Sequence, residues 1–175
     1  MHSAGVAIIG LGSPHGDDRV GHLVAKQLLE NLNNDSNVYL ITQPIDLVEL
    51  LRLYRRCFLI DACSTGAVHG TIVRIEWPCD SLTSRFSGTS SHGFSVADAL
   101  SLAEQLDFTS CDVTIYGVEM DEVAPSAPLS SEVLASVPEV VARIMNEIAA
   151  FETASDTSET GPSTATILGD VLETN

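Results

Sequence analysis

Short apolar runs alternate with segments of helical spacing along residues 6–60 of the chain. The apolar runs cover residues 6–10, 39–42 and 57–60. The segments between them, about residues 18–32 and 46–56, carry apolar side chains at intervals of three and four, as one face of a helix does. An order of strand, helix, strand, helix and strand is typical of a doubly wound, parallel sheet. We therefore expect an α/β fold.

The remaining segments extend this pattern to a complete domain. Residues 71–77 alternate in polarity, which predicts an edge or half-exposed strand. Further periodic segments predict a helix over 95–106, a strand over 112–118 and a closing helix over 131–151. The expected fold is a single three-layer domain over residues 1–151, with about five strands in a mostly parallel, twisted sheet and helices on both faces. Residues 152–175 are acidic and rich in serine and threonine, which predicts a disordered tail.

Composition narrows the classes of partner. The 175 residues are 45% hydrophobic, enough for one sizeable core, and 8 lysines and arginines against 24 acidic residues give a net charge of −16. That charge disfavours binding to nucleic acid or to an anionic membrane. The N-terminal apolar stretch has no basic flank, and no run of about 20 apolar residues occurs. We expect a cytoplasmic protein and take a monomer as the working assumption.

Polar residues follow several of the predicted strands. Asp18 lies in a glycine-rich turn after the first strand, Asp61 ends the third strand, and His92 precedes the helix at 95. Ligand sites of doubly wound folds lie at the carboxyl ends of the strands, so we expect these side chains to converge. Two carboxylates and an imidazole suit zinc, nickel, cobalt or manganese, and three protein ligands leave positions open for water or substrate.

Each of these residues also has a simpler structural explanation. Asp17 or Asp18 could cap the helix that follows, Asp61 could serve only as a structural hydrogen-bond acceptor, and His92 could be a capping or hydrogen-bonded histidine. A dinucleotide site is disfavoured because His15 stands where the fingerprint needs its third glycine. The chain also lacks the Gly-x-Ser-x-Gly motif of a nucleophilic serine.

Four motifs in order resemble the hydrogenase maturation endopeptidase family, which trims the C-terminal extension of nickel–iron hydrogenase large subunits. They are GLGSP with GDDRVG at residues 10–21, LIDA at 59–62, SSHGFS at 90–95 and YGVE at 116–119. The resemblance covers about residues 5–150. One departure from the family's pattern is Ser13, where the family commonly has asparagine.

The resemblance implies a five-stranded sheet with helices on both faces and a metal-contacting, catalytic trio of Asp18, Asp61 and His92. It also implies a partner, a hydrogenase large-subunit precursor, and a metal, nickel, which the substrate carries and which zinc or cadmium could replace. No cofactor-binding residues are expected beyond the trio. Glu119 or Asp17 could act as an additional proton acceptor. Two alternatives keep the same metal site: a hydrolase of small amides or esters, and a metal-sensing chaperone that does not cut.

Overall fold

The computed structural model describes residues 3–32, 37–78, 94–108, 111–120 and 128–159. At its centre is a five-stranded sheet of order β2-β1-β3-β5-β4. Its strands are β1 (Ser3–Leu11), β2 (Asn37–Ile41), β3 (Tyr54–Cys63), β4 (Ile72–Trp77) and β5 (Asp112–Glu119). Neighbouring strands are parallel except for β4, which pairs antiparallel with β5 at one edge. The predicted mostly parallel sheet, with an edge strand near residues 71–77, is confirmed.

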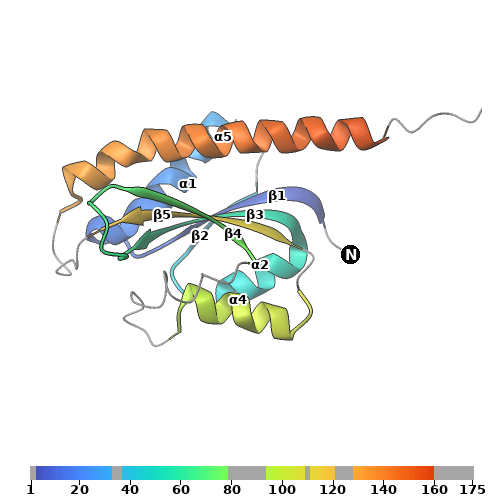
Figure 1. The fold of residues 1–175 in the computed structure, drawn as a ribbon, viewed down its shortest axis with the longest axis horizontal. Coiled ribbons are helices and arrows are strands. Elements are labelled where there is room, and N and C mark those ends of the chain that lie inside the picture. The colour runs from blue at the N-terminus through green and yellow to red at the C-terminus, as the bar shows by residue number, and fades with distance from the viewer. Residues whose placement is uncertain (1–2, 33–36, 79–93, 109–110, 121–127, 160–175) are drawn as a thin grey trace, which may run out of the picture.

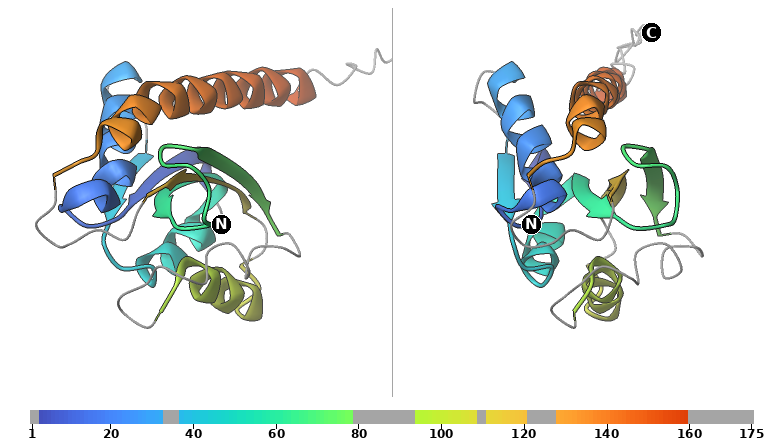
Figure 2. Two further views of the ribbon diagram at one scale, coloured as in Figure 1. Left: turned by 60° about the vertical axis from the view of Figure 1, so that its left-hand side comes forward. Right: turned by 90° about the vertical axis from the view of Figure 1, so that its left-hand side faces the viewer.

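Helices cover both faces of the sheet, as Figures 1 and 2 show. Helices α1 (Val20–Asn31) and α5 (Ser131–Glu159) pack against one face, and α2 (Asp46–Leu53) and α4 (Val96–Gln105) against the other. The alternation of β3 divides the core: Phe58 and Ile60 face α1 and α5, whereas Cys57 and Leu59 face α2 and α4. The three-layer prediction is therefore confirmed.

Two predicted boundaries differ from the structure. The second helix was expected to reach residue 56, but α2 ends at Leu53 and Tyr54 opens β3. Tyr54 fits helical spacing, but its buried ring and its hydroxyl contact with Tyr39 are made from extended backbone. The closing helix was expected to end at Phe151, yet α5 continues to Glu159. Once a helix has formed, each added residue gains a hydrogen bond, so residues 152–159 extend it although they lack large apolar side chains.

Helix α5 therefore includes residues 152–159, which the prediction assigned to the tail, while residues 160–175 lie outside the described part of the chain. The division of the chain at residue 151 stays a prediction.

Glycines allow α1 to lie against the ends of β1 and β3. A Cβ at Gly21 would lie 2.2 Å from the carbonyl oxygen of Leu11 and 2.4 Å from that of Ile60, and one at Gly10 would lie 2.3 Å from the oxygen of Gly21. Gly12 has a φ of +145°, and a Cβ at this position would clash with the backbone of Asp18. The glycine-rich turn therefore brings the backbone of the first helical segment onto the edge of the sheet where Asp61 lies.

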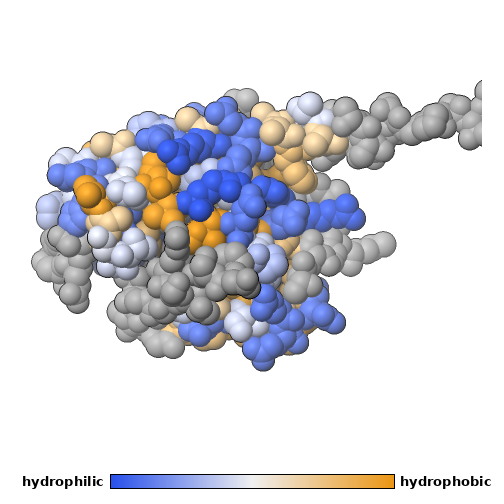
Figure 3. All heavy atoms as spheres, viewed as in Figure 1, coloured by the Kyte–Doolittle hydropathy of each residue, from blue (hydrophilic) through white to orange (hydrophobic). Residues whose placement is uncertain are grey.

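The face of the protein formed by β4 and α5 is largely polar. Figure 3 shows hydrophilic side chains over much of the face formed by β4 and α5, with smaller apolar areas among them. None of the described helices is long and apolar enough to cross a membrane.

Candidate active site

The two predicted aspartates lie at the carboxyl ends of neighbouring strands, at the switch point of the sheet. β1 and β3 are paired, with Gly10 opposite Ile60, and the chain leaves β1 toward β2 but continues from β3 toward the opposite edge. In doubly wound sheets the loops diverge at such a point and leave a crevice at the carboxyl ends of the strands. Asp18 lies in a short 3-10 helix, η1 (Gly16–Arg19), after β1, and Asp61 lies near the end of β3. The topology therefore brings both carboxylates to one edge.

Asp18 does not cap a helix. Its Oδ2 accepts a 2.7 Å hydrogen bond from the backbone N–H of Ser13, which closes the turn between β1 and η1. Helix α1 begins at Val20, and its N-cap residue, Arg19, makes no side-chain capping bond. The capping interpretation of Asp18 is therefore wrong. Because Ser13 uses its backbone N–H, serine in place of asparagine leaves this contact intact. Among the described residues, no donor is hydrogen-bonded to Asp18 Oδ1.

Asp61 is a half-buried carboxylate whose charge is poorly compensated. Burial raises its pKa well above the usual value, and the nearby negative charge of Asp18 raises it further, while a 2.9 Å hydrogen bond from the N–H of Ala62 to Oδ1 opposes these effects. The alternative role for Asp61, a purely structural hydrogen-bond acceptor, accounts only for this one bond to Ala62. Within the described part of the chain, Asp61 Oδ2 accepts none. The two aspartates thus lie within electrostatic range of each other.

His92 lies outside the described residues, so the complete trio is not tested. Its nearest described neighbours in the sequence lead into α4, whose N-cap is Ser95. Ser95 forms a reciprocal capping box with Asp98, which fixes where this helix begins. Helix α4 covers the same face of the sheet as the odd-numbered residues of β3, the set that includes Asp61. In the described part of the chain, no cluster of three or more histidine, cysteine, aspartate or glutamate side chains could hold a metal ion.

Asp17 and Glu119, the two suggested proton acceptors, are already engaged in structural hydrogen bonds. The buried Asp17 accepts a 2.6 Å bond from the N–H of Ser130, the residue before α5. Glu119, at the end of β5, is 1% exposed, and its carboxylate accepts bonds from the loop that joins β3 and β4. Sequence reasoning missed this use of Glu119. The only available signal was an acidic residue at the end of a buried strand.

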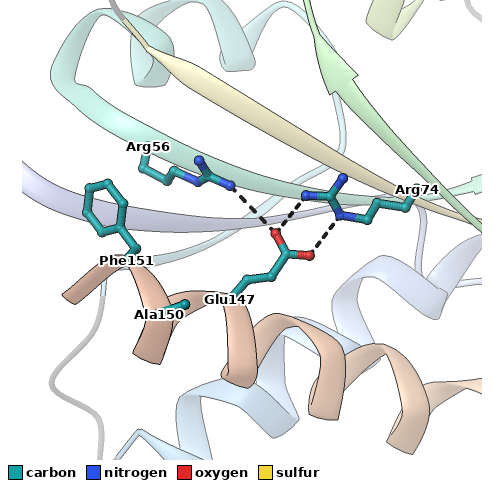
Figure 4. Close-up of a pocket in the computed structure, with 5 residues that line it drawn as sticks. All are labelled: Arg56, Arg74, Glu147, Ala150 and Phe151. Atoms are coloured by element: carbon teal, nitrogen blue, oxygen red, sulfur yellow. Dashed lines mark hydrogen bonds and ion pairs between the residues drawn. The ribbon is translucent and has the colours of Figure 1, made fainter. Parts of the chain in front are cut away.

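A second charged cluster lies on the face covered by α5 (Figure 4). Arg56, Arg74, Glu147, Ala150 and Phe151 line a pocket of about 480 Å³. Glu147 accepts two hydrogen bonds from Arg74, at 2.8 and 3.0 Å, and lies 3.6 Å from Arg56. Glu147 thus compensates both guanidinium groups, and the cluster joins α5 to the sheet. Because it lies away from the aspartates, we regard this cluster as structural.

The sequence model for the family of hydrogenase maturation proteases matches residues 22–147, well over half of the chain. The chain belongs to this family. The matched range includes Asp61 and His92 and begins just after Asp18. No curated protein matches the chain in sequence.

Solved structures of family members share the fold. The NiFe hydrogenase maturation protease HybD from Thermococcus kodakarensis is 24% identical, with a TM-score of 0.64 over 85% of this chain and 99% of that one. HybD from E. coli is 15% identical, with a TM-score of 0.64 over 85% and 93%. The solution structure of the endopeptidase HycI from Escherichia coli is 21% identical, with a TM-score of 0.59 over 79% and 88%.

Membership of the hydrogenase maturation protease family makes the chain a protease, and hence a hydrolase. That class confirms the predicted enzyme and excludes a chaperone that does not cut. It also favours peptide bonds over small amides or esters as the substrate. The family match does not test the roles of Asp18, Asp61 and His92 or the nickel, and these remain proposals.

Proposed function

We propose that this protease removes the C-terminal extension of a nickel-containing hydrogenase large-subunit precursor, after recognising the nickel that the precursor already carries. The observation that supports this most directly is the pair of half-buried carboxylates, Asp18 and Asp61, at the switch point of the sheet. Each has one oxygen with no hydrogen-bond donor among the described residues. Together they form an electronegative site at the edge where ligands of this fold bind. The cytoplasm stays the predicted compartment.

The chemistry of the two carboxylates fits a divalent ion. Two nearby negative charges repel each other, and a cation between them would remove the repulsion and stabilise the ionised form of both groups. His92 would supply a nitrogen ligand, which suits nickel and the ions that could replace it, such as zinc or cadmium. The precursor's own ligands would complete the coordination, so the protease needs no resident metal.

In this account Asp18 and Asp61 act first by docking. Binding to the substrate's nickel would hold the precursor against the carboxyl edge of the sheet and bring the peptide bond close to the same carboxylates. A carbonyl or water bound to a metal is more reactive, and this is the chemistry that the substrate's own ion supplies. Precursor without nickel would lack the group that the aspartates recognise, so cutting would wait until the metal is inserted.

Binding of a metal alone should test the role of His92. We expect His92→Ala to weaken binding of Cd²⁺ or Zn²⁺ by more than about tenfold. Loss of a residue that only supports a metal ligand already lowers affinity by about tenfold or more, and loss of the ligand itself should lower it further. If His92 is a metal ligand and not a structural residue, the thermal midpoint without metal should stay within about 2 °C of wild type. Calorimetric titration measures the metal affinity of the wild type and the variant, and a thermal scan of each measures the midpoint. Equal metal affinity in the two proteins would remove His92 from the proposed site.

Deletion of residues 160–175 should leave cleavage of the precursor largely intact. Only four of these sixteen residues, Ile167, Leu168, Val171 and Leu172, have large apolar side chains, and most of the rest are small or polar, so we expect them to add little to the core. The truncation keeps α5 entire, including Glu147 and Phe151. Rate measurements on the full-length and truncated proteins provide the comparison. A large loss of activity with an unchanged thermal midpoint would instead assign the tail a part in binding the precursor.

A further inference from the structure

The loop between β3 and β4, residues 64–71, lies beside the carboxylate pair and is held by a single buried side chain. It begins three residues after Asp61, and its exposed part covers residues 64–68. Val68 is 80% exposed, which is unusual for a large apolar side chain in an otherwise well-packed domain. Such a loop would normally move freely unless its backbone N–H groups were bonded elsewhere.

Glu119 provides those bonds. Its Oε1 accepts hydrogen bonds from the backbone N–H groups of Thr65, Gly66 and Ala67, at 2.7, 2.8 and 3.2 Å. Its Oε2 accepts a bond of 2.8 Å from the Thr65 hydroxyl and lies 3.6 Å from Cys63 Sγ. Bonds to an ionised acceptor are about twice as strong as neutral ones, so this carboxylate fixes three successive residues. These hydrogen bonds also hold the pKa of Glu119 below its usual value despite its burial.

The backbone of the same residue holds the far end of the loop. The N–H of Glu119 donates to the carbonyl of Thr71, and its carbonyl accepts from the N–H of Gly70, both at 2.9 Å. Gly70 lies against α5, because a Cβ there would come within 2.5 Å of the carbonyl oxygen of Glu132. The loop thus packs against the first turn of α5. The residue before this turn, Ser130, donates a hydrogen bond to Asp17 of η1.

These contacts form one continuous rim around the carboxyl edge of the sheet. The rim runs from η1, which carries Asp18, through the start of α5 to the β3–β4 loop, and the loop leads back to Asp61 through β3. Cys63 lies near both carboxylates, because its Sγ is 3.6 Å from Glu119 Oε2 and it follows Asp61 by two residues on the same strand. A peptide docked on Asp18 and Asp61 would therefore have the exposed residues 64–68 beside it.

We propose that residues 64–68 form a wall of the substrate site, against which the precursor's peptide lies, and that Glu119 is the positioning residue that sets this wall. Glu119 acts through the loop backbone and touches neither metal nor scissile bond. This inference rests on the proposed function, because it assumes a peptide docked at Asp18 and Asp61. Fixed loops of this kind contribute to binding more than to chemistry, since they lower the entropy lost when substrate is ordered.

The test measures kcat, KM and thermal midpoint on a nickel-loaded precursor. Glu119→Ala leaves the loop N–H groups without an acceptor, and we expect KM to rise by about tenfold or more with a smaller change in kcat per folded molecule. Glu119→Gln keeps one carbonyl oxygen for the three N–H groups and should restore KM to within a few fold. The matched control is Glu147→Ala. This variant also removes a carboxylate that accepts several hydrogen bonds, but Glu147 lies in the separate cluster with Arg74, so KM should not change.

A second variant decides the question if Glu119→Ala fails to fold. Ala67→Trp places a bulky side chain on an exposed position of the wall and should raise KM with no change in thermal midpoint. Ala142→Trp, on the exposed side of α5, is its control. Wild-type protein that does not cleave the precursor would refute the proposed function itself. Wild-type protein that does cleave, with KM unchanged in Ala67→Trp or in folded Glu119→Ala, would refute the wall.

Discussion

Replacing Asp61 with asparagine should abolish cleavage while making the protein more stable. Asparagine keeps the shape of the side chain and an acceptor for the N–H of Ala62, but it removes a charge that is buried and repelled by Asp18. If Asp61 contacts the substrate's metal as proposed, its loss should lower the rate by more than about 100-fold, because even residues that only support a metal ligand cost about 10- to 100-fold. Removal of the buried charge should raise the thermal midpoint by about 2–4 °C for each kcal/mol gained in the free energy of unfolding.

The gain in stability should depend on pH in a defined direction. The pKa of Asp61 in the folded protein lies above its value of 3.8 in an unfolded chain, so between these two values the folded state binds more protons. The wild-type protein therefore loses stability as pH rises through this window, and the Asp61→Asn variant does not. The difference in thermal midpoint should be largest at pH 8 and shrink toward pH 5. A lower midpoint for Asp61→Asn at pH 8 would show that the carboxylate stabilises the fold.

Replacing Gly21 with alanine should cost more stability than its single added methyl suggests. Alanine favours helix over glycine by about 1 kcal/mol, which alone would stabilise α1. The added Cβ, however, would lie 2.2 and 2.4 Å from the backbone oxygens of Leu11 and Ile60, and backbone cannot rotate away as a side chain can. We expect a net loss of about 2 kcal/mol or more, because α1 must move away from β1 and β3.

Thermal and urea unfolding measure this loss, with Lys26→Ala on the exposed side of the same helix as the control. The control should change the free energy of unfolding by less than about 0.5 kcal/mol. Metal affinity should also fall in Gly21→Ala, since η1 precedes the displaced helix and carries Asp18. If the variant is instead as stable as helix propensity alone predicts, the close approach of α1 to the sheet is not required.

The fold was predictable because its signals are local. Buried parallel strands such as β1 and β3 appear as apolar runs, and α1 and α2 appear as apolar residues at helical spacing. The end of α2 was not predictable, since Tyr54 suits helical spacing and is placed in β3 by contacts with Tyr39 across the sheet. The length of α5 depends on helix propagation beyond Phe151, which apolar periodicity does not record.

The candidate site was predictable where topology alone determines it. Asp18 and Asp61 lie at the carboxyl ends of strands that are neighbours at the switch point, so their proximity followed from strand order. The contacts of Asp17 with Ser130 and of Glu119 with the β3–β4 loop join residues more than 50 positions apart. Nothing in local sequence marks such pairs, and both acidic residues therefore resembled candidate proton acceptors rather than structural anchors.

Mass spectrometry of a large-subunit precursor tests the central claim most directly. The wild-type protein is incubated with nickel-loaded precursor and, separately, with the same precursor freed of nickel, and the Asp61→Asn variant is run beside it. We predict that only the wild-type protein with nickel-loaded precursor releases a C-terminal peptide, with a matching loss of mass from the precursor. Equal release from the nickel-free precursor, or from either precursor by Asp61→Asn, would contradict recognition of the substrate's nickel by the aspartate pair.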